Sequence, residues 1–361
     1  LSRGSQADDQ ESKNIMHDFH FLDGELYCEE VKVREIASHE KTPFYLYSRK
    51  TIRDHYRKLD KALSPVPHLI CYSLKANSSI AICRILGQMG AGADITSGGE
   101  LYKAGMAGIS GGKIVYAGVG KTKEEIKYAI ESGILMFNVE SVQELHAINK
   151  TAAALGEKVS IAFRLNPEVE VDTHSYTRTG TSESKFGVTA GELEKIFMQM
   201  DEFPNVEMKG IHVHIGSQIT DIQPYVKSVA MAADLAKTLK SRGINLKWLN
   251  IGGGMGIIYK DEKPSTVAEF APAVLSRLAP TGLKLIIEPG RFIVGNAGIL
   301  VTKVLYIKKS RSRKFVVVEA GMNDLIRPAL YQAYHEIKPL TLPSKAGQSE
   351  VVDIVGPICE S

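Results

Sequence analysis

Eight short apolar segments recur along the middle of the chain, and their spacing constrains the fold more than any other feature. They occupy residues 68–75, 93–97, 113–118, 135–140, 158–165, 208–216, 246–253 and 283–290. Each is almost continuously apolar, which is typical of strands that are buried on both faces of a parallel sheet. Amphipathic segments such as KEEIKYAIESG lie between them, with apolar residues three and four positions apart. The alternation predicts eight βα units.

Eight consecutive βα units are the number that closes a (β/α)8 barrel. An open, doubly wound sheet is the alternative, but regular units without a long interruption favour closure. We therefore expect an α/β fold with a TIM-type barrel over residues 49–296. A chain of 361 residues is long enough for a second, smaller domain beside it.

The sequence changes character on both sides of the barrel. Residues 298–321 are typical of two long strands joined by the polar turn KKSRSRK, and residues 43–48 and 350–358 predict further strands. We expect a mainly antiparallel β domain built from residues 17–48 and 297–361. The last strand is followed at once by the end of the chain, so we expect the C-terminal part of this domain to be incomplete. The polar residues 1–16 are expected to form a disordered leader.

Composition excludes several classes of protein. Hydrophobic residues make up 44% and charged residues 24%, as in ordinary globular proteins, and the net charge of +3 indicates neither nucleic acid nor an anionic membrane as a partner. No run of about 18 apolar residues predicts a membrane span. Four cysteines without a CxxC pair favour a reducing compartment, so we expect a cytoplasmic protein without a disulfide framework.

Polar residues gather where the predicted strands end, and in a barrel of this kind chemistry collects at those ends. The candidates are Lys75, Asp94, Arg164, His212, His214, Ser217, Gly252, Gly253, Gly254, Glu288, Gly290 and Arg291. Their convergence on one end of the barrel predicts a binding or catalytic site there.

Each candidate taken alone has an alternative interpretation. Lys75 could simply cap a strand, or it could be an amine whose pKa is lowered by desolvation so that it forms a Schiff base. The triple glycine that begins at Gly252 could make a tight turn or direct its N–H groups at an anion. His212 and His214, two apart on one strand, could bind zinc, stack on a cofactor ring or be core histidines. Glu288 could form an ion pair with Arg291 or keep a pyridine nitrogen protonated.

Several motifs together resemble those of a known family. YSLKAN, GADITSGGEL, HVHIGSQ, NIGGGMGI, EPGRF, MNDLIRPALYQAYH and CES occur in order and spacing. They are similar to the motifs of decarboxylases that use pyridoxal phosphate (PLP) in an alanine-racemase-like barrel, and within that family to diaminopimelate decarboxylases. The resemblance covers residue 17 to the end of the chain.

The resemblance implies a role for each cofactor residue. Lys75 would hold PLP as a Schiff base, His214 would stack on its ring, and Glu288 would pair with the pyridine nitrogen. Asp94 and Arg164 would support Lys75. The phosphate would be held by Ser217, by Gly252, Gly253 and Gly254, and by the backbone of Gly290 and Arg291.

The resemblance also implies the substrate and the assembly. Arg291, Arg327, Tyr331 and Glu360 would bind the substrate, and Cys359 would be the acid that reprotonates the carbanion. Cys359 and Glu360 would reach the active site of the other subunit, so the resemblance implies a homodimer. The implied activity is decarboxylation of meso-2,6-diaminopimelate to L-lysine and CO2.

Other functions remain open at this point. Within the family, the substrate could be another basic amino acid: ornithine, lysine, arginine or carboxynorspermidine. From a different class, a metal-dependent barrel hydrolase could use His212 and His214, with His174 and Asp172 as further ligands. A non-catalytic relative is a third alternative, although Lys75, Glu288 and Cys359 are all present.

Overall fold

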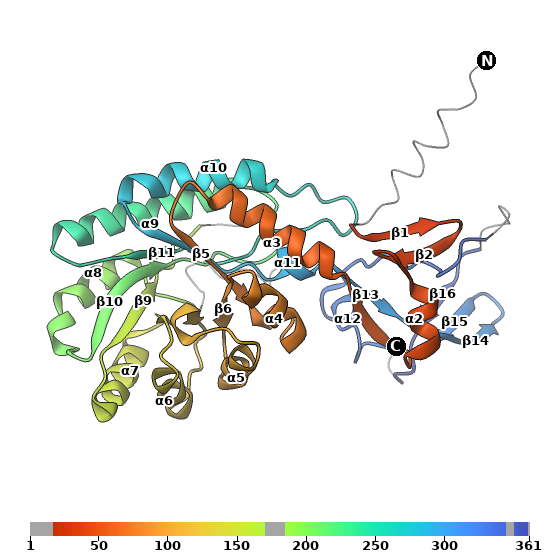
Figure 1. Ribbon diagram of the computed structural model, residues 1–361, viewed down its shortest axis with the longest axis horizontal. Coiled ribbons are helices and arrows are strands. Elements are labelled where there is room, and N and C mark those ends of the chain that lie inside the picture. The colour runs from red at the N-terminus through yellow and green to blue at the C-terminus, as the bar shows by residue number, and fades with distance from the viewer. Residues whose placement is uncertain (1–16, 170–184, 344–349, 360–361) are drawn as a thin grey trace, which may run out of the picture. The chain divides into compact units, whose positions relative to one another are not determined.

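The computed structural model describes residues 17–169, 185–343 and 350–359, and it contains a closed, eight-stranded parallel barrel (Figure 1). Its strands are β5 (His68–Ser73), β6 (Gly92–Ile95), β7 (Ile114–Tyr116), β8 (Met136–Val139), β9 (Val159–Arg164), β10 (Val206–His212), β11 (Trp248–Asn250) and β12 (Lys284–Ile287). Strand β12 pairs in parallel with β5 and closes the ring. The predicted barrel is confirmed, and the open sheet is excluded.

Helices lie around the strands in Figure 1, and all but α3 and α11, which flank the barrel sequence, connect one strand to the next. They are α3 (Arg49–Leu63), α4 (Ile80–Gln88), α5 (Gly98–Met106), α6 (Lys123–Glu131), α7 (Val142–Leu155), α8 (Ala190–Met198), α9 (Gln223–Ser241), α10 (Val267–Leu278) and α11 (Arg291–Val294). Five of these helices begin at a Ser or Thr whose hydroxyl accepts the N–H of a glutamate three residues later. This local signal fixes where each helix starts, independently of the barrel.

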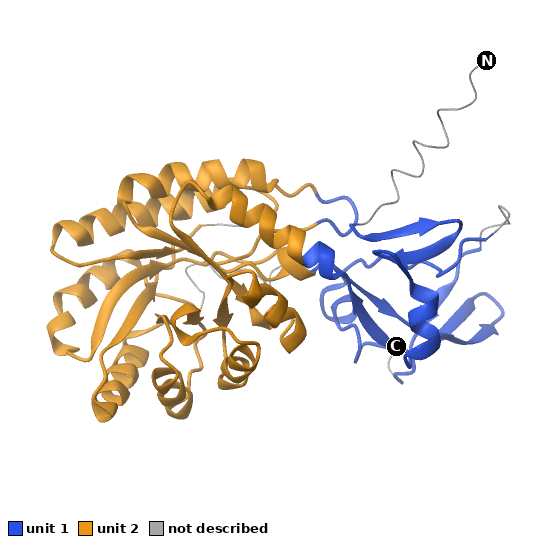
Figure 2. Ribbon diagram, in the orientation of Figure 1, with its two compact units in different colours: residues 1–52, 258–262, 295–361 blue, residues 53–257, 263–294 orange. Residues whose placement is uncertain are grey.

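The chain divides into two compact units, coloured separately in Figure 2. Residues 53–257 and 263–294 form unit 2, which contains the barrel strands. Residues 1–52, 258–262 and 295–361 form unit 1. The short segment 258–262 belongs to unit 1 although the residues on both sides of it belong to unit 2, and no sequence pattern predicted this. The expected domain boundaries near residues 48 and 297 stay predictions.

Unit 1 is a mainly antiparallel β domain, as predicted. Strands β1 (Phe19–Leu22), β2 (Glu25–Cys28) and β3 (Val31–Lys32) form one sheet, β4 (Phe44–Tyr47) pairs with β13 (Gly298–Val301), and β14 (Val304–Lys309) forms a hairpin with β15 (Lys314–Val318). Strand β16 (Asp353–Val355) pairs with β15 in parallel, an exception to the antiparallel pattern. Two short helices complete the described part of the unit, α2 (Val33–His39) and α12 (Arg327–Tyr331).

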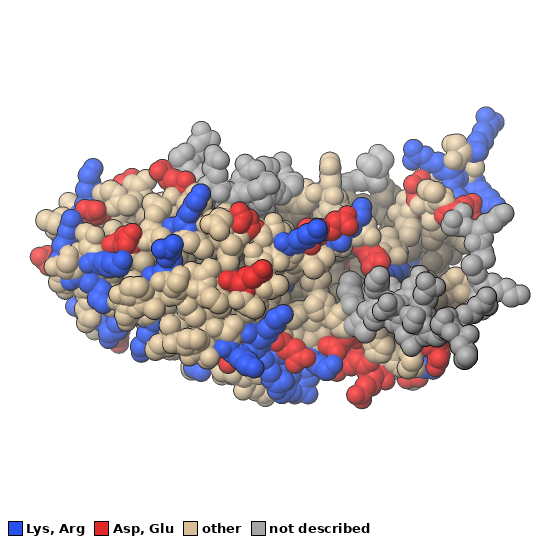
Figure 3. Space-filling view, turned by 90° about the horizontal axis from the view of Figure 1, so that it is seen from above, with Lys and Arg blue, Asp and Glu red and all other residues tan. Residues whose placement is uncertain are grey.

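Charges on the surface are mixed. In Figure 3, acidic and basic side chains are interspersed over the visible face, in keeping with the small net charge of +3. Within the described part of the chain, no helix has both the length and the apolar character that crossing a membrane requires.

The glycine loop after β11 provides a test of how tightly the barrel mouth is packed. A Cβ at Gly253 would overlap the carbonyl oxygen of Glu288, whereas a Cβ at Gly105, inside α5, would meet nothing. Gly253→Ala should destabilise the protein by about 2 kcal/mol or more through this clash. Gly105→Ala should stabilise it by about 0.5–1 kcal/mol, since alanine favours a helix. Denaturant unfolding measures both changes in the free energy of unfolding. Equal changes for the two variants would contradict the tight packing inferred at Gly253.

Candidate active site

Eight buried polar side chains line the barrel where its strands end, although most of the other strand residues are apolar. They are Ser73, Asp94, Asn138, Glu140, Arg164, His212, Asn250 and Glu288, each 5% exposed or less. Burying charged groups is costly unless partners compensate for the lost water. The contacts among these side chains therefore determine what the site can do.

Lys75 lies in a 3-10 turn, Leu74–Ala76, that directly follows β5, so it lies two residues beyond the end of the strand in which the sequence analysis placed it. Its Nζ donates a hydrogen bond of 3.1 Å to Oδ2 of Asp94 at the end of β6. The hydroxyl of Ser73 donates to the same carboxylate oxygen. Lys75 and Asp94 are thus brought together by two neighbouring strands, and half of the lysine side chain stays exposed, at 50%.

The charge state of Lys75 differs from the prediction. Burial by itself would lower the pKa of this amine, but the negative charges of Asp94 and Glu288 outweigh burial and raise the pKa above its usual value. The prediction of a pKa lowered by desolvation is therefore wrong for the amine in this structure. Burial and the charge of Glu288 in turn raise the pKa of Asp94 to about 6. Lys75 is accordingly a cation beside a carboxyl group that takes up protons readily.

Glu288 is held by three side chains from other strands. Its Oε1 accepts hydrogen bonds from Nδ2 of Asn138, at 2.9 Å, and from Nδ2 of Asn250, at 2.5 Å. Its Oε2 lies 3.4 Å from Nε2 of His212. Burial would raise the pKa of Glu288, but His212, Lys75 and the amide of Asn250 together lower it below its usual value. Glu288 is therefore a buried, ionised and firmly oriented carboxylate.

His214 lies two residues beyond the end of β10, which finishes at His212, so the two histidines do not share a strand. The Nδ1 atom of His214 accepts the backbone N–H of Gly253, at 3.2 Å. Burial, followed by the positive charges of Arg164 and Lys75, lowers its pKa well below the usual value. His214 is therefore neutral, and its ring is fixed by the glycine loop.

Two N–H groups of the triple glycine bind neighbouring side chains, whereas the anion-binding interpretation had these groups pointing at an anion. The N–H of Gly252 donates to Oδ1 of Asn250, at 2.9 Å, and that of Gly253 donates to His214. Gly252 and Gly254 adopt positive φ angles of 66° and 99°, which favour glycine. The loop thus orients Asn250 and His214 around the barrel mouth.

The hydrogen bonds of Arg164 support His214 and do not reach Lys75. Its Nη1 pairs with Oε1 of Glu140 at 2.8 Å, and its Nη2 donates to the carbonyl of His214 at 3.1 Å. The second oxygen of Glu140 accepts the N–H of Gly187 at 2.9 Å. This buried ion pair joins the ends of β8, β9 and β10.

Gln218 joins the loop that follows β10 to the loop that follows β11. Its Nε2 donates to the carbonyl of Ile257 at 2.6 Å, and its Oε1 accepts the N–H of Ile257 at 3.2 Å. Nη1 of Arg291, the first residue of α11, donates to the same Oε1 at 3.4 Å. Arg291, which follows β12, is thereby oriented from the loop that follows β10, two strands earlier in the sequence.

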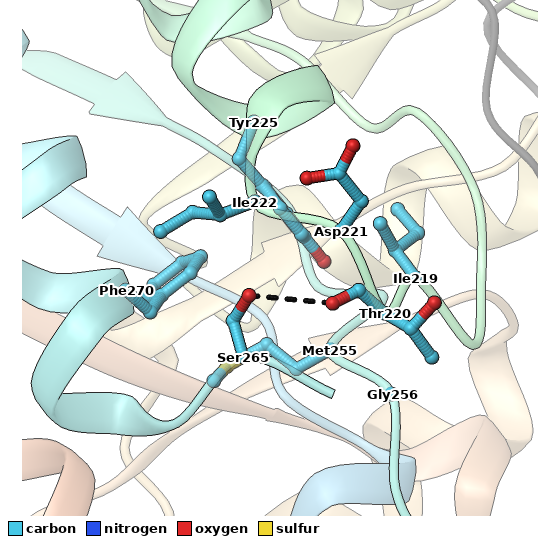
Figure 4. A pocket seen from close by; sticks show the side chains of 9 residues that line it. All are labelled: Ile219, Thr220, Asp221, Ile222, Tyr225, Met255, Gly256, Ser265 and Phe270. Carbon is cyan, nitrogen blue, oxygen red and sulfur yellow. Dashed lines mark hydrogen bonds between the residues drawn. The ribbon is translucent and has the colours of Figure 1, made fainter. Parts of the chain in front are cut away.

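A small pocket lies behind the glycine loop (Figure 4). Met255 and Gly256, which directly follow Gly254, line it together with Ile219 and Phe270. The hydroxyl of Tyr225, which lines it, donates to the carbonyl of Gly253 at 2.9 Å. Ser265 donates to the carbonyl of Thr220 across it, as the dashed line shows. The pocket therefore belongs to the support of the glycine loop.

The candidates for substrate binding and product protonation other than Arg291 belong to unit 1. Arg327 and Tyr331 are the first and last residues of α12, which confirms that this segment is helical. Cys359 is an exposed free thiol. Glu360 lies outside the described residues, as do Asp172 and His174, the further metal ligands considered above. The described residues contain no group of three or more His, Cys, Asp or Glu side chains suited to a metal ion.

Four residues of the polar cluster were not identified from the sequence: Ser73, Asn138, Glu140 and Asn250. Each interrupts or directly follows an apolar run near its C-terminal end, as in ICYSL, LMFNVE and LKWLNI. In a barrel strand that is buried on both faces, a polar side chain near the C-terminal end points either toward the surrounding helices or into the barrel interior. That signal could have identified them, although not their partners.

These features occur together with a clear family relationship. Residues 49–295 match the family described as pyridoxal-dependent decarboxylase, pyridoxal binding domain. The fold and the site thus define the class: this is a PLP-dependent amino-acid decarboxylase.

Comparison with individual proteins narrows the class. The chain is 48% identical over 342 residues to diaminopimelate decarboxylase of Aquifex aeolicus, covering 94% of this chain and 80% of that one. The crystal structure of the Helicobacter pylori enzyme complexed with L-lysine has a TM-score of 0.86 at 40% identity, covering 91% of this chain and 82% of that one. The M. jannaschii enzyme with L-lysine has a TM-score of 0.88 at 38% identity, covering 95% and 82%. The chain belongs to the diaminopimelate decarboxylase family.

The buried ion pair of Arg164 and Glu140 should stabilise the site strongly. Arg164→Met leaves an unpaired buried carboxylate, so we expect a loss of about 3–5 kcal/mol in the free energy of unfolding. Arg242→Met breaks a similar pair with Glu194 in which both side chains are 44% exposed, and it should cost less than about 1 kcal/mol. Adding Glu140→Gln to Arg164→Met should recover part of the loss. Chemical denaturation measures all three, and equal costs at the two pairs would contradict the argument.

Proposed function

We propose that this protein removes one carboxylate from meso-2,6-diaminopimelate with PLP and releases L-lysine and CO2. The observation that carries the proposal is the similarity to diaminopimelate decarboxylases, at 40–48% identity over most of the chain. Two related crystal structures are described as complexed with L-lysine, the product of this reaction. The arrangement of Lys75, Asp94 and Glu288 is chemically suited to it.

The polar cluster fits the cofactor. An ionised carboxylate held by two amides, Glu288, suits a protonated pyridine nitrogen, and that nitrogen makes PLP an electron sink when it is bound. The neutral ring of His214 can stack on an aromatic cofactor without a charge of its own. We assign Lys75 as the lysine that holds PLP and Asp94 as its direct support, while Arg164 supports the site through the backbone of His214. The phosphate is assigned to Ser217, Gly254 and the backbone of Gly290 and Arg291, while Gly252 and Gly253, whose N–H groups bind Asn250 and His214, shape the loop around it.

Asp94 holds the amine of Lys75 in place. Its Oδ2 atom lies 3.1 Å from Nζ, and its negative charge helps to raise the pKa of Lys75 above the usual value. An amine attacks only after it has lost its proton, so Lys75 must give up that proton before it can hold PLP. With a pKa of about 6, Asp94 is a much weaker base than the Lys75 amine and does not by itself remove the proton. We therefore assign Asp94 the orientation of the Lys75 amine.

Substrate recognition is assigned to charged groups that match both ends of diaminopimelate. Arg291, Arg327 and Tyr331 suit carboxylate groups, and Glu360 suits the distal amine. Cys359 is assigned as the acid that protonates the product carbon. We further propose a homodimer, in which Cys359 and Glu360 act in the active site of the partner. A cytoplasmic location fits the four free cysteines.

Release of CO2 tests the substrate. Purified protein with added PLP should release CO2 from meso-diaminopimelate and form L-lysine, with kcat/KM at least about 100-fold above that for ornithine or lysine, because both lack the distal carboxylate. Lys75→Ala should abolish turnover and the visible absorbance of the bound cofactor, while Lys127→Ala, an exposed lysine on α6, should change neither. Faster release of CO2 from ornithine or lysine would show that this amino acid, and not diaminopimelate, is the substrate.

Mixing two inactive variants tests the shared site. If Lys75 and Cys359 of one active site come from different subunits, Lys75→Ala and Cys359→Ala should complement each other when subunits exchange. Half of the dimers would be mixed and each would carry one intact site, so about a quarter of the wild-type activity should return. Mixtures as inactive as the separate variants would mean that each subunit builds its own site.

A further inference from the structure

A cluster of aromatic and basic side chains surrounds Arg327 in unit 1. The guanidinium carbon of Arg327 lies 4.2 Å from the ring centroid of Tyr259. Its Nη1 lies 2.9 Å from Nε2 of His335. The rings of Tyr259 and His335 meet edge to face, with centroids 5.6 Å apart and an angle of 71°. Tyr259 belongs to the segment 258–262 that leaves the barrel sequence for unit 1.

The hydrogen bond between Arg327 and His335 defines the state of the imidazole. A guanidinium only donates hydrogen bonds, so Nε2 of His335 must be the acceptor and Nδ1 must carry the proton. Burial, and then the charge of Arg327, lower the pKa of His335 below its usual value, so the ring is neutral at pH 7. A neutral acceptor orients the guanidinium without cancelling its charge, as a carboxylate acceptor would.

The two contacts fix different degrees of freedom of Arg327. The contact with Tyr259 restricts the position of the guanidinium over the ring, because cation–π attraction acts only close to the ring face. The hydrogen bond to His335 restricts the direction in which its N–H groups point. A long arginine side chain held in this way loses little further freedom when it binds a ligand.

We propose that Tyr259 and His335 are positioning residues that pre-orient Arg327 to read the distal carboxylate of the substrate. The inference rests on the proposed function, in which the substrate carries a second carboxylate, distal to the one that is released as CO2. A planar, charged guanidinium suits bidentate recognition of a carboxylate, and its orientation decides whether both donors reach. Tyr259 and His335 thereby contribute to specificity without contacting the substrate.

A second pair in the same two segments provides a matched control. Nζ of Lys260 lies 5.4 Å from the ring centroid of Tyr334, so a neighbouring cation–π contact joins residues 258–262 to the segment after α12. Tyr334→Leu removes an aromatic ring of the same kind at a side chain that is 46% exposed. A purely structural role for these contacts would make Tyr334→Leu and Tyr259→Leu similar.

The test compares KM with kcat for meso-diaminopimelate in the PLP-loaded enzyme. Tyr259→Leu and His335→Leu should each raise KM roughly tenfold with kcat within about twofold, because binding of the distal end weakens while the chemistry is unchanged. Tyr259→Phe keeps the ring and His335→Gln keeps an acceptor, so both should stay within about threefold of the wild-type KM. Tyr334→Leu should match the wild type.

A double-variant cycle separates positioning from loss of structure. Arg327→Met should raise KM, and adding Tyr259→Leu to it should cause no further change, since the arginine to be positioned is gone. Arg327→Met with an unchanged KM would overturn the inference. So would additive losses in the double variant, or leucine variants with a wild-type KM. If the wild-type enzyme does not decarboxylate diaminopimelate at all, the proposed function fails first, and that result is distinct from all of these.

Discussion

The rest of the site depends on the hydrogen bonds and charge contacts that keep the buried carboxylate of Glu288 ionised inside the closed barrel. Two asparagine amides and His212 keep it charged although water is excluded. Its charge then determines the state of its neighbours: it raises the pKa of Asp94 and supports the cationic form of Lys75. A buried charge of this kind is tolerated only because three strands supply its partners.

The same arrangement explains why the site needs a supporting layer. His214 is neutral and held by the glycine loop, and the loop is held by Asn250 and Tyr225. Arg164 and Glu140 fix the backbone of His214 from the other side. The residues that the sequence suggested for cofactor contact are thus positioned by residues that make no such contact. In unit 1, Tyr259 and His335 bear the same relation to Arg327 in our proposal.

Much of this could be predicted from the sequence, and the limits have physical causes. Apolar runs alternating with amphipathic segments predicted every barrel strand, because a strand buried on both faces must be apolar. Lys75 and Glu288 were identified because charged residues at the ends of such runs are unusual. The pKa of Lys75 was predicted in the wrong direction, since it depends on charges from β6 and β12 that only the closed barrel brings together. The contact between Tyr259 and His335 was missed because no local pattern shows that residues 258–262 join unit 1.

The protonation state of the cofactor ring tests the central claim most directly. In the PLP-loaded enzyme, with the pyridine nitrogen labelled with 15N, the NMR shift of that nitrogen should report a protonated ring paired with Glu288. In Glu288→Gln the carboxylate charge is lost, and the shift should move to that of an unprotonated ring. An unprotonated ring in the wild-type enzyme, or an unchanged shift in Glu288→Gln, would contradict the role assigned to this carboxylate.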